Sequence, residues 1–196
     1  MKTTLIALFA AFTLTSSSLY AQQTAKIPDG FLESMQGDWK GKLTYTDYQN
    51  DATQVTMDVW LKSSIENKKL IKQFYYQEPN STTKQKSKSQ DTTLIAKEGY
   101  ALVESGYTLP FAIQESSSTE TKHSSKTITD GVNTSQSASA SREQQIVMET
   151  ADNDNNKPST IRVTISTSPN SMIIKKEVKY NGTNSFFVRH TFAYTK

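Results

Sequence analysis

The sequence predicts an all-β protein, an antiparallel up-and-down β-barrel of about ten strands preceded by one short helix. Two observations carry this prediction: apolar and polar residues alternate along many short segments, and turn residues separate those segments at short intervals. In addition, consecutive segments are joined by hairpin-like turns, which is typical of an up-and-down meander. Closing such one-sided strands into a barrel removes their free edges.

The only helical pattern lies in residues 27–36, where Pro28 and Asp29 stand at the start and Gly37 at the end. The first strand is expected to begin near Trp39, and others near Val55, Leu70, Thr92, Tyr100 and Tyr107. The strand at Ile146 should end in the turn-forming run 151–156. Three further strands are expected at 161–165, 172–180 and 186–194, the last two joined by the hairpin signal Asn181-Gly182.

Residues 114–145 are rich in Ser and Thr and contain few apolar side chains. A long hairpin turning at Asp130-Gly131 and a mobile loop both fit this composition. We favour a partly ordered hairpin with frayed flanks.

The N-terminus has the features of a secretory signal peptide. Lys2 is followed by the apolar run 5–14 and then by small residues up to Ala21. We therefore expect a signal peptide at 1–21, a single domain at 22–196, and an exported protein that is periplasmic or extracellular. The apolar run is too short to span a membrane, and no later stretch is long enough, so no transmembrane segment is expected.

Composition excludes several function classes. The chain has no cysteine, which rules out disulfides and Cys-ligated metal sites, and its 22 Lys and Arg nearly balance 19 Asp and Glu. The densest basic run, Lys84, Lys86 and Lys88, has the spacing of a solvent-facing edge strand, and nucleic-acid binding is not expected. No nucleophile motif, phosphate-binding loop or metal-ligand cluster is present.

The segment Gly37-Asp38-Trp39, after a short helix and at the start of the first strand, resembles the G-x-W signature of lipocalin-like (calycin-type) barrels, in particular small secreted bacterial domains. The resemblance implies that Trp39 closes the barrel floor and that a basic residue near the chain end packs on it. Arg189 is the candidate. Strict alternation along the last strand would instead point Arg189 away from Val188 and Phe192, unless a bulge shifts the register.

The expected function is binding of a small apolar or amphipathic molecule inside the barrel. A filled barrel without a cavity is an equal alternative. The residues expected to line the lumen are Leu43, Tyr45, Val59, Leu61, Phe74, Leu109, Phe111, Phe192 and Tyr194.

Three alternatives stay open. His190, on the apolar side of the last strand, could bind haem, since some haem-binding barrels that share the G-x-W opening use one histidine as axial ligand; we expect no cofactor. A surface interaction module could use the Ser/Thr-rich hairpin or Trp60. An enzyme on this barrel would need titratable groups that converge in the lumen, and we do not expect one.

Overall fold

The computed structural model describes residues 25–87, 90–129 and 132–196, and between residues 125 and 139 it describes the backbone only. The expected signal peptide and the expected turn at 130–131 lie outside the described residues. Among those described, no helix is long and apolar enough to cross a membrane. In chain order the elements are α1 (Phe31–Ser34), β1 (Gly37–Thr46), β2 (Gln54–Glu66), β3 (Lys69–Gln77), β4 (Gln85–Lys86), β5 (Asp91–Ala96), η1 (Lys97–Gly99), β6 (Ala101–Glu104), β7 (Phe111–Thr129), β8 (Val132–Asp154), β9 (Lys157–Thr167), β10 (Ser171–Tyr180) and β11 (Phe187–Thr195).

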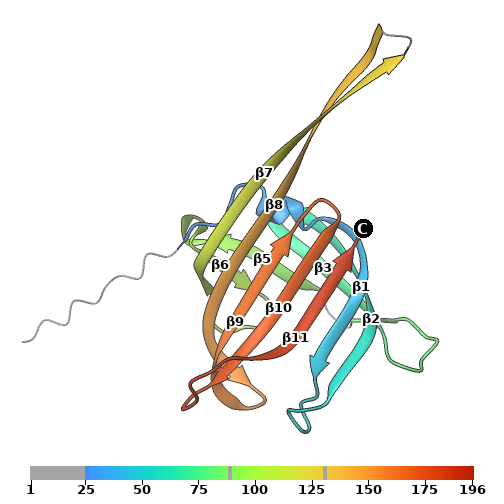
Figure 1. Ribbon diagram of the computed structural model, residues 1–196. Helices are drawn as coiled ribbons and strands as arrows, with labels where there is room; N and C mark the ends of the chain where they lie inside the picture. Colours follow the sequence, from blue (N-terminus) through green and yellow to red (C-terminus); the bar gives the residue numbers. More distant parts are fainter. Residues whose placement is uncertain (1–24, 88–89, 130–131) are drawn as a thin grey trace, which may run out of the picture.

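Ten of the described strands close into one antiparallel barrel (Figure 1). Each strand pairs with its neighbours in the sequence, and β11 pairs with β1 to complete the ring. The short strand β4 is attached to β3 outside this order, and β3 passes directly to β5. The predicted fold, an up-and-down barrel of about ten strands with one short helix, is confirmed.

The two strands around the Ser/Thr-rich region are longer than their apolar content indicates. β7 begins at Phe111, not at Tyr107, and β8 continues to Asp154 through a run that we expected to be a turn. The actual turn between β8 and β9 uses Asn155 and Asn156, whose φ angles of 51° and 60° suit a tight hairpin. β8 pairs with β9 as far as Asp154 and Lys157, so β8 extends beyond the segment in which the hydrophobic pattern predicted a strand.

A β-bulge in β11 resolves the uncertainty about Arg189. Lys176 of β10 lies opposite His190, whereas Glu177 lies opposite Val188, so Arg189 is an extra residue in the ladder. The bulge turns Arg189 into the barrel, where its side chain is fully buried, and leaves Val188 41% exposed. The expectation that Val188 faces the interior is therefore wrong, because the period-2 pattern is interrupted at the residue after it.

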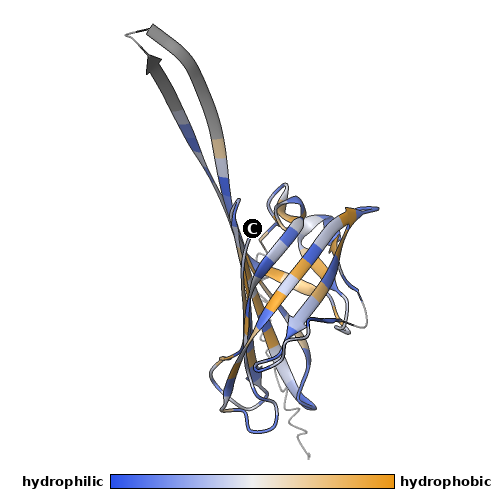
Figure 2. Ribbon diagram, turned by 90° about the vertical axis from the view of Figure 1, so that its right-hand side faces the viewer, coloured by the Kyte–Doolittle hydropathy of each residue, from blue (hydrophilic) through white to orange (hydrophobic). Residues whose placement is uncertain are grey.

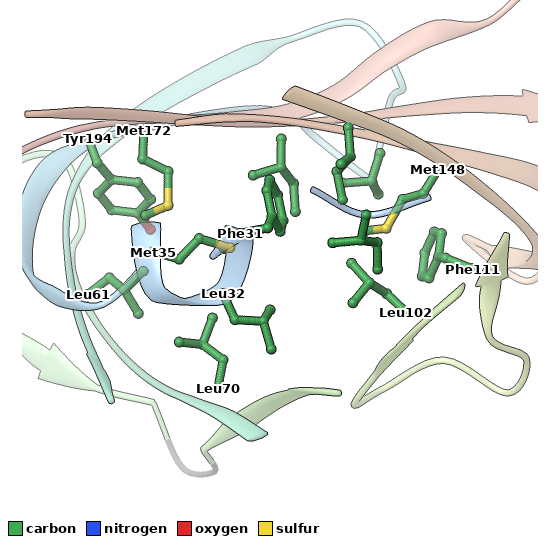
Figure 3. Packing of buried hydrophobic residues seen from close by; sticks show 14 of the residues in the cluster. Phe31, Leu32, Met35, Leu61, Leu70, Leu102, Phe111, Met148, Met172 and Tyr194 are labelled. Carbon is green, nitrogen blue, oxygen red and sulfur yellow. The ribbon is translucent and has the colours of Figure 1, made fainter. Parts of the chain in front are cut away.

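One end of the barrel is filled by the helix. Phe31, Leu32 and Met35 are buried and point into the barrel toward Leu61 and Leu70 of β2 and β3 (Figure 3). The N-terminal segment is fixed to the barrel by backbone bonds as well, from Ala25 to Ile113 and from Ile27 to Gly99. This end is a packed hydrophobic core, so any cavity must lie farther along the barrel.

β7 and β8 continue past this end as a two-stranded ribbon (Figure 1). We call residues 119–129 and 132–143 the arm. Its two strands pair with each other throughout, whereas pairing of β8 with β9 stops at Gln144. Arg142 and Gln144 donate hydrogen bonds to the Asp29 carbonyl at 3.3 and 2.8 Å, which ties the base of the arm to the segment before α1. The paired strands of the favoured hairpin are therefore present, but its flanks are paired and not frayed.

Candidate functional site

A cavity of about 270 Å³ lies inside the barrel beyond the helix. Met35 of the helix end forms part of its wall, so the cavity starts where the packed core stops. Aromatic, aliphatic and charged side chains all contribute to the lining: Met35, Lys72, Phe74, Tyr76, Asp91, Glu104, Ser105, Tyr107, Phe111, Met148, Val163, Ile165, Ile174, His190 and Phe192. The interior is thus neither wholly filled nor wholly hollow.

Three of the predicted lining residues, Phe74, Phe111 and Phe192, do line this cavity. The rings of Phe74 and Phe192 lie 5.7 Å apart across the interior, and Tyr107 meets the ring of Phe111 edge-on at 4.7 Å. These contacts are within the range favoured by aromatic pairs, so the rings support one another as a preformed apolar wall.

The other predicted lining residues lie elsewhere. Leu109 is 51% exposed, because it belongs to the turn before β7 and not to a strand, and it does not line the cavity. None of the remaining five borders the cavity. Tyr45 is half-buried outside the hydrophobic core, whereas the other four belong to that core or pack against it: Leu43, Val59, Leu61 and Tyr194.

A buried ion pair lies on one side of the cavity. Lys72 donates to Glu104 at 2.7 Å, and the second carboxylate oxygen of Glu104 accepts a 2.7 Å hydrogen bond from Thr93. Lys72 and Glu104 are 8% and 9% exposed, so both charges are held away from water. Removing either partner of this pair would leave an uncompensated buried charge, which is strongly unfavourable.

Asp91 faces the same ion pair but has no bonded partner. It lies opposite Lys72 in the β3–β5 ladder and is half-buried in the cavity wall. Within the described residues its carboxylate makes neither a hydrogen bond nor an ion pair. Burial raises the pKa of Asp91, and the nearby Lys72 only partly opposes that shift.

His190 lines the cavity from β11, with its ring edge-on to Phe192 at 5.2 Å. Burial lowers the pKa of His190 to about 4, and the positive charge of Lys176 adds to this effect. The imidazole is therefore neutral at pH 7, and it makes no hydrogen bond within the described residues. It offers one donor and one acceptor nitrogen to the cavity.

Arg189 does not pack on Trp39. The two residues belong to opposite ends of the barrel, since Trp39 begins β1 whereas Arg189 adjoins the residue that pairs with Tyr45 near the end of β1. Trp39 is 2% exposed and donates from Nε1 to the Met35 carbonyl at 3.0 Å. The cation over its ring is the Nζ of Lys196, at 4.5 Å. The expected floor contact thus exists with a different basic residue.

Arg189 instead organises a charged cluster at the other end. It binds Asp154 through Nε at 2.9 Å, Asp51 through Nη1 at 2.8 Å and the hydroxyl of Tyr180 through Nη2 at 2.6 Å. Lys176 completes the cluster by donating to Asp154 at 2.9 Å. The hydrogen bond from Arg189 lowers the pKa of Asp51. This cluster ties the loop after β1 to β8, β10 and β11.

The sequence patterns missed the polar half of the cavity. Lys72 and Glu104 occupy inward positions on β3 and β6, where alternation predicts apolar side chains. Tyr76 was left out of the expected lining, and burial raises its pKa to about 12, so its hydroxyl stays protonated at neutral pH. The missed signal was a pair of opposite charges, Lys72 and Glu104, at inward positions on β3 and β6, the two strands that flank β5.

Comparisons with known proteins do not name a family. No protein-family model matches the chain, and no curated protein matches it. A solved structure that does match is the crystal structure of Rv2717c from M. tuberculosis, with a TM-score of 0.48 and 7% sequence identity over 85% of this chain and 94% of that one. The function must therefore be argued from the cavity itself.

Proposed function

We propose that this protein binds one small, partly apolar molecule in the interior cavity. The observation that carries the proposal is the cavity of about 270 Å³ with aromatic rings on several walls and a few convergent polar groups. Binding sites for small molecules have this composition, and the volume lies just under the range typical of drug-sized ligands. A molecule with a single ring and a short chain has a suitable size.

The polar groups would fix the orientation of such a ligand. Asp91, His190 and Tyr107 all border the cavity and make no side-chain hydrogen bond within the described residues. Binding sites need unused donors and acceptors of this kind, because those already bonded to protein gain little from a ligand. Phe74 and Phe192 would then hold the apolar body.

The test uses two tryptophan substitutions on adjacent residues of β10. Ile174 lines the cavity, whereas Ile173 is 47% exposed on the outer face. Ile174→Trp should fill the cavity and abolish binding of 2-phenylethanol, measured by calorimetric titration and by NMR shift changes. Ile173→Trp should bind like the wild type. Equal binding by both variants would contradict the proposal. So would a wild-type protein that binds neither 2-phenylethanol nor its charged analogues 2-phenylethylamine and 3-phenylpropanoate.

His190 supports a second candidate, haem binding. Its neutral, unbonded imidazole faces the cavity, as an axial ligand must. Against this, the charged pair Lys72–Glu104 borders the same limited space. We therefore rank haem below a smaller ligand and expect no Soret band on addition of haemin. A strong band that His190→Ala removes, while the fold is retained, would reverse this ranking.

We also propose that the protein acts after export, as the signal-peptide pattern in residues 1–21 indicates. Expression of the full chain in a bacterial host should give a product whose N-terminus lies near Gln22. N-terminal sequencing of the exported fraction checks this, and recovery of an intact Met1 would contradict it.

A further inference from the structure

We infer that the ligand is a small organic cation, an amine attached to an apolar body, and that Asp91 is the residue that binds its charged group. This inference rests on the proposed function and specifies the chemical class of the ligand. It follows from the distribution of charge within the barrel, taken together with the aromatic walls of the cavity.

Among the residues that the structure describes, each buried cation already has a carboxylate partner. Lys72 is bonded to Glu104, and Lys176 and Arg189 are both bonded to Asp154. Arg189 also binds Asp51. None of these cations is free to pair with an anionic ligand without breaking a buried ion pair, which is strongly unfavourable.

The carboxylates include one that is left over. One carboxylate oxygen of Glu104 accepts a hydrogen bond from Lys72 and the other accepts one from Thr93, so both oxygens are in use. Asp91 has neither a hydrogen bond nor an ion pair within the described residues, although it lies in the cavity wall. The groups that line the cavity thus carry one more negative than positive charge, and Asp91 accounts for the excess.

A cationic ligand would correct this imbalance. A carboxylate taken from water without a partner is unfavourable, and an ammonium group beside it supplies both charge and hydrogen-bond donors. Burial disfavours the ionised form of Asp91, whose pKa is raised, and a bound cation would favour that form. Anionic or neutral head groups offer no such gain.

The walls of the cavity suit the rest of such a ligand. The rings of Phe74, Phe111 and Phe192 border the same space, with those of Tyr76 and Tyr107. Their faces attract a desolvated cation as well as an apolar chain. His190 remains neutral at pH 7, so it adds no repulsive charge. The aromatic walls and the unpaired carboxylate therefore favour the same class of molecule.

The experiment compares three probes that share a phenylethyl body: 2-phenylethylamine, 2-phenylethanol and 3-phenylpropanoate. Binding to the purified protein is measured by calorimetric titration at pH 7. The amine should bind about tenfold more tightly than the alcohol, and the carboxylate should bind most weakly. Asp91→Asn should remove the preference for the amine, so that the variant binds the amine and the alcohol with similar affinity. Asp38→Asn, which removes an exposed carboxylate from the outer face of β1, should behave like the wild type.

The variants also report on folding, since Asp91→Asn removes a charge that burial disfavours. Its thermal midpoint at pH 7 should equal or exceed that of the wild type. If none of the three probes binds, the proposed function fails. If the alcohol or the carboxylate binds at least as tightly as the amine, or if Asp91→Asn keeps the preference, a cavity that binds small molecules stands and the cationic ligand class is overturned.

Discussion

The strands β7 and β8 run through both the barrel and the arm, yet they are stabilised differently in the two regions. In the barrel, β8 buries Ile146 and Met148 on its inner face, whereas residues 119–124 of β7 in the arm are all exposed. Figure 2 shows hydrophobic bands along the strands of the barrel, whereas the coloured part of the arm is mostly hydrophilic. The hydrogen-bonded register continues across the boundary with a single ladder. Backbone pairing of β7 with β8 therefore does not require buried side chains, but the net stability that the paired strands contribute does depend on burial.

The physical reason is that each strand–strand hydrogen bond replaces bonds to water. Its net contribution is about 1 kcal/mol or less, whereas burial of a large apolar side chain contributes about 1.5–3 kcal/mol. A two-stranded ribbon with both faces in water is marginal by itself. The arm persists as a continuation of a ladder whose lower part is anchored in the core.

The largest effect is expected at Trp39, in the barrel. Its ring is 2% exposed and its indole nitrogen is bonded to Met35. Trp39→Ala should lower the free energy of unfolding by about 3–5 kcal/mol, because it leaves a large cavity and removes the hydrogen bond to the Met35 carbonyl. Urea unfolding followed by circular dichroism checks this. Trp39→Phe serves as the matched control and should have a smaller effect, and unfolding like that of the wild type would show that the helix does not seal the barrel.

An intermediate effect is expected from His190, through pH. Its pKa falls from 6.5 in the unfolded chain to about 4 in the folded barrel. The unfolded state thus binds the proton first, so stability is complete above pH 6.5 and falls as the pH drops toward 4. The loss should reach at most about 3 kcal/mol, because each pKa unit corresponds to 1.36 kcal/mol.

The measurement is a series of urea unfolding curves between pH 7 and pH 4 for the wild type and His190→Gln. Glutamine cannot take up a proton in this range, so the difference between the two proteins isolates the histidine from the acidic groups that titrate nearby. Parallel stability profiles would mean that His190 is hydrated in the folded state and that the cavity is wetter than its lining indicates.

The smallest effect is expected in the arm. Replacing residues 122–140 by Asn-Gly joins Thr121 to Ser141, which are paired in the ladder, through a two-residue turn. Arg142 and its contact with Asp29 are kept. The shortened protein should unfold within about 1 kcal/mol of the wild type, since the side chains described in the deleted segment, at 122–124 and 140, are exposed. A much larger loss would show that the arm stabilises the barrel and that the two regions are not independent.

The same contrast explains which parts of the structure could be predicted. Strands with one buried face, such as β9 with Ile161, Val163 and Ile165, follow the period-2 pattern and were expected at nearly the right positions. The favoured hairpin at 114–145 is present, but its length and the extension of β8 to Asp154 could not be predicted, because ladder pairing there is not encoded by apolar residues.

The candidate site was predictable only in its apolar half. Phe74, Phe111 and Phe192 could be selected from alternation, and His190 was expected on the inner side. Asp91 and Glu104 could not be assigned to one cavity, because their proximity arises from the pairing of β3, β5 and β6. Leu109 was misplaced because the sequence does not show that the turn extends to residue 110.

The extra residue at position 189 divides β11 into two segments of opposite parity. From His190 to the chain end, even-numbered residues face inward, whereas Arg189 on the other side of the break is odd-numbered and also faces inward. The inward-facing residues on the two sides of the bulge, Arg189 on one side and His190, Phe192 and Tyr194 on the other, therefore follow two separate alternation patterns. Loss of one residue at the bulge would restore a single parity and exchange the inner and outer faces of one segment relative to the other. Any alignment of this strand with another protein must accordingly be made in two parts.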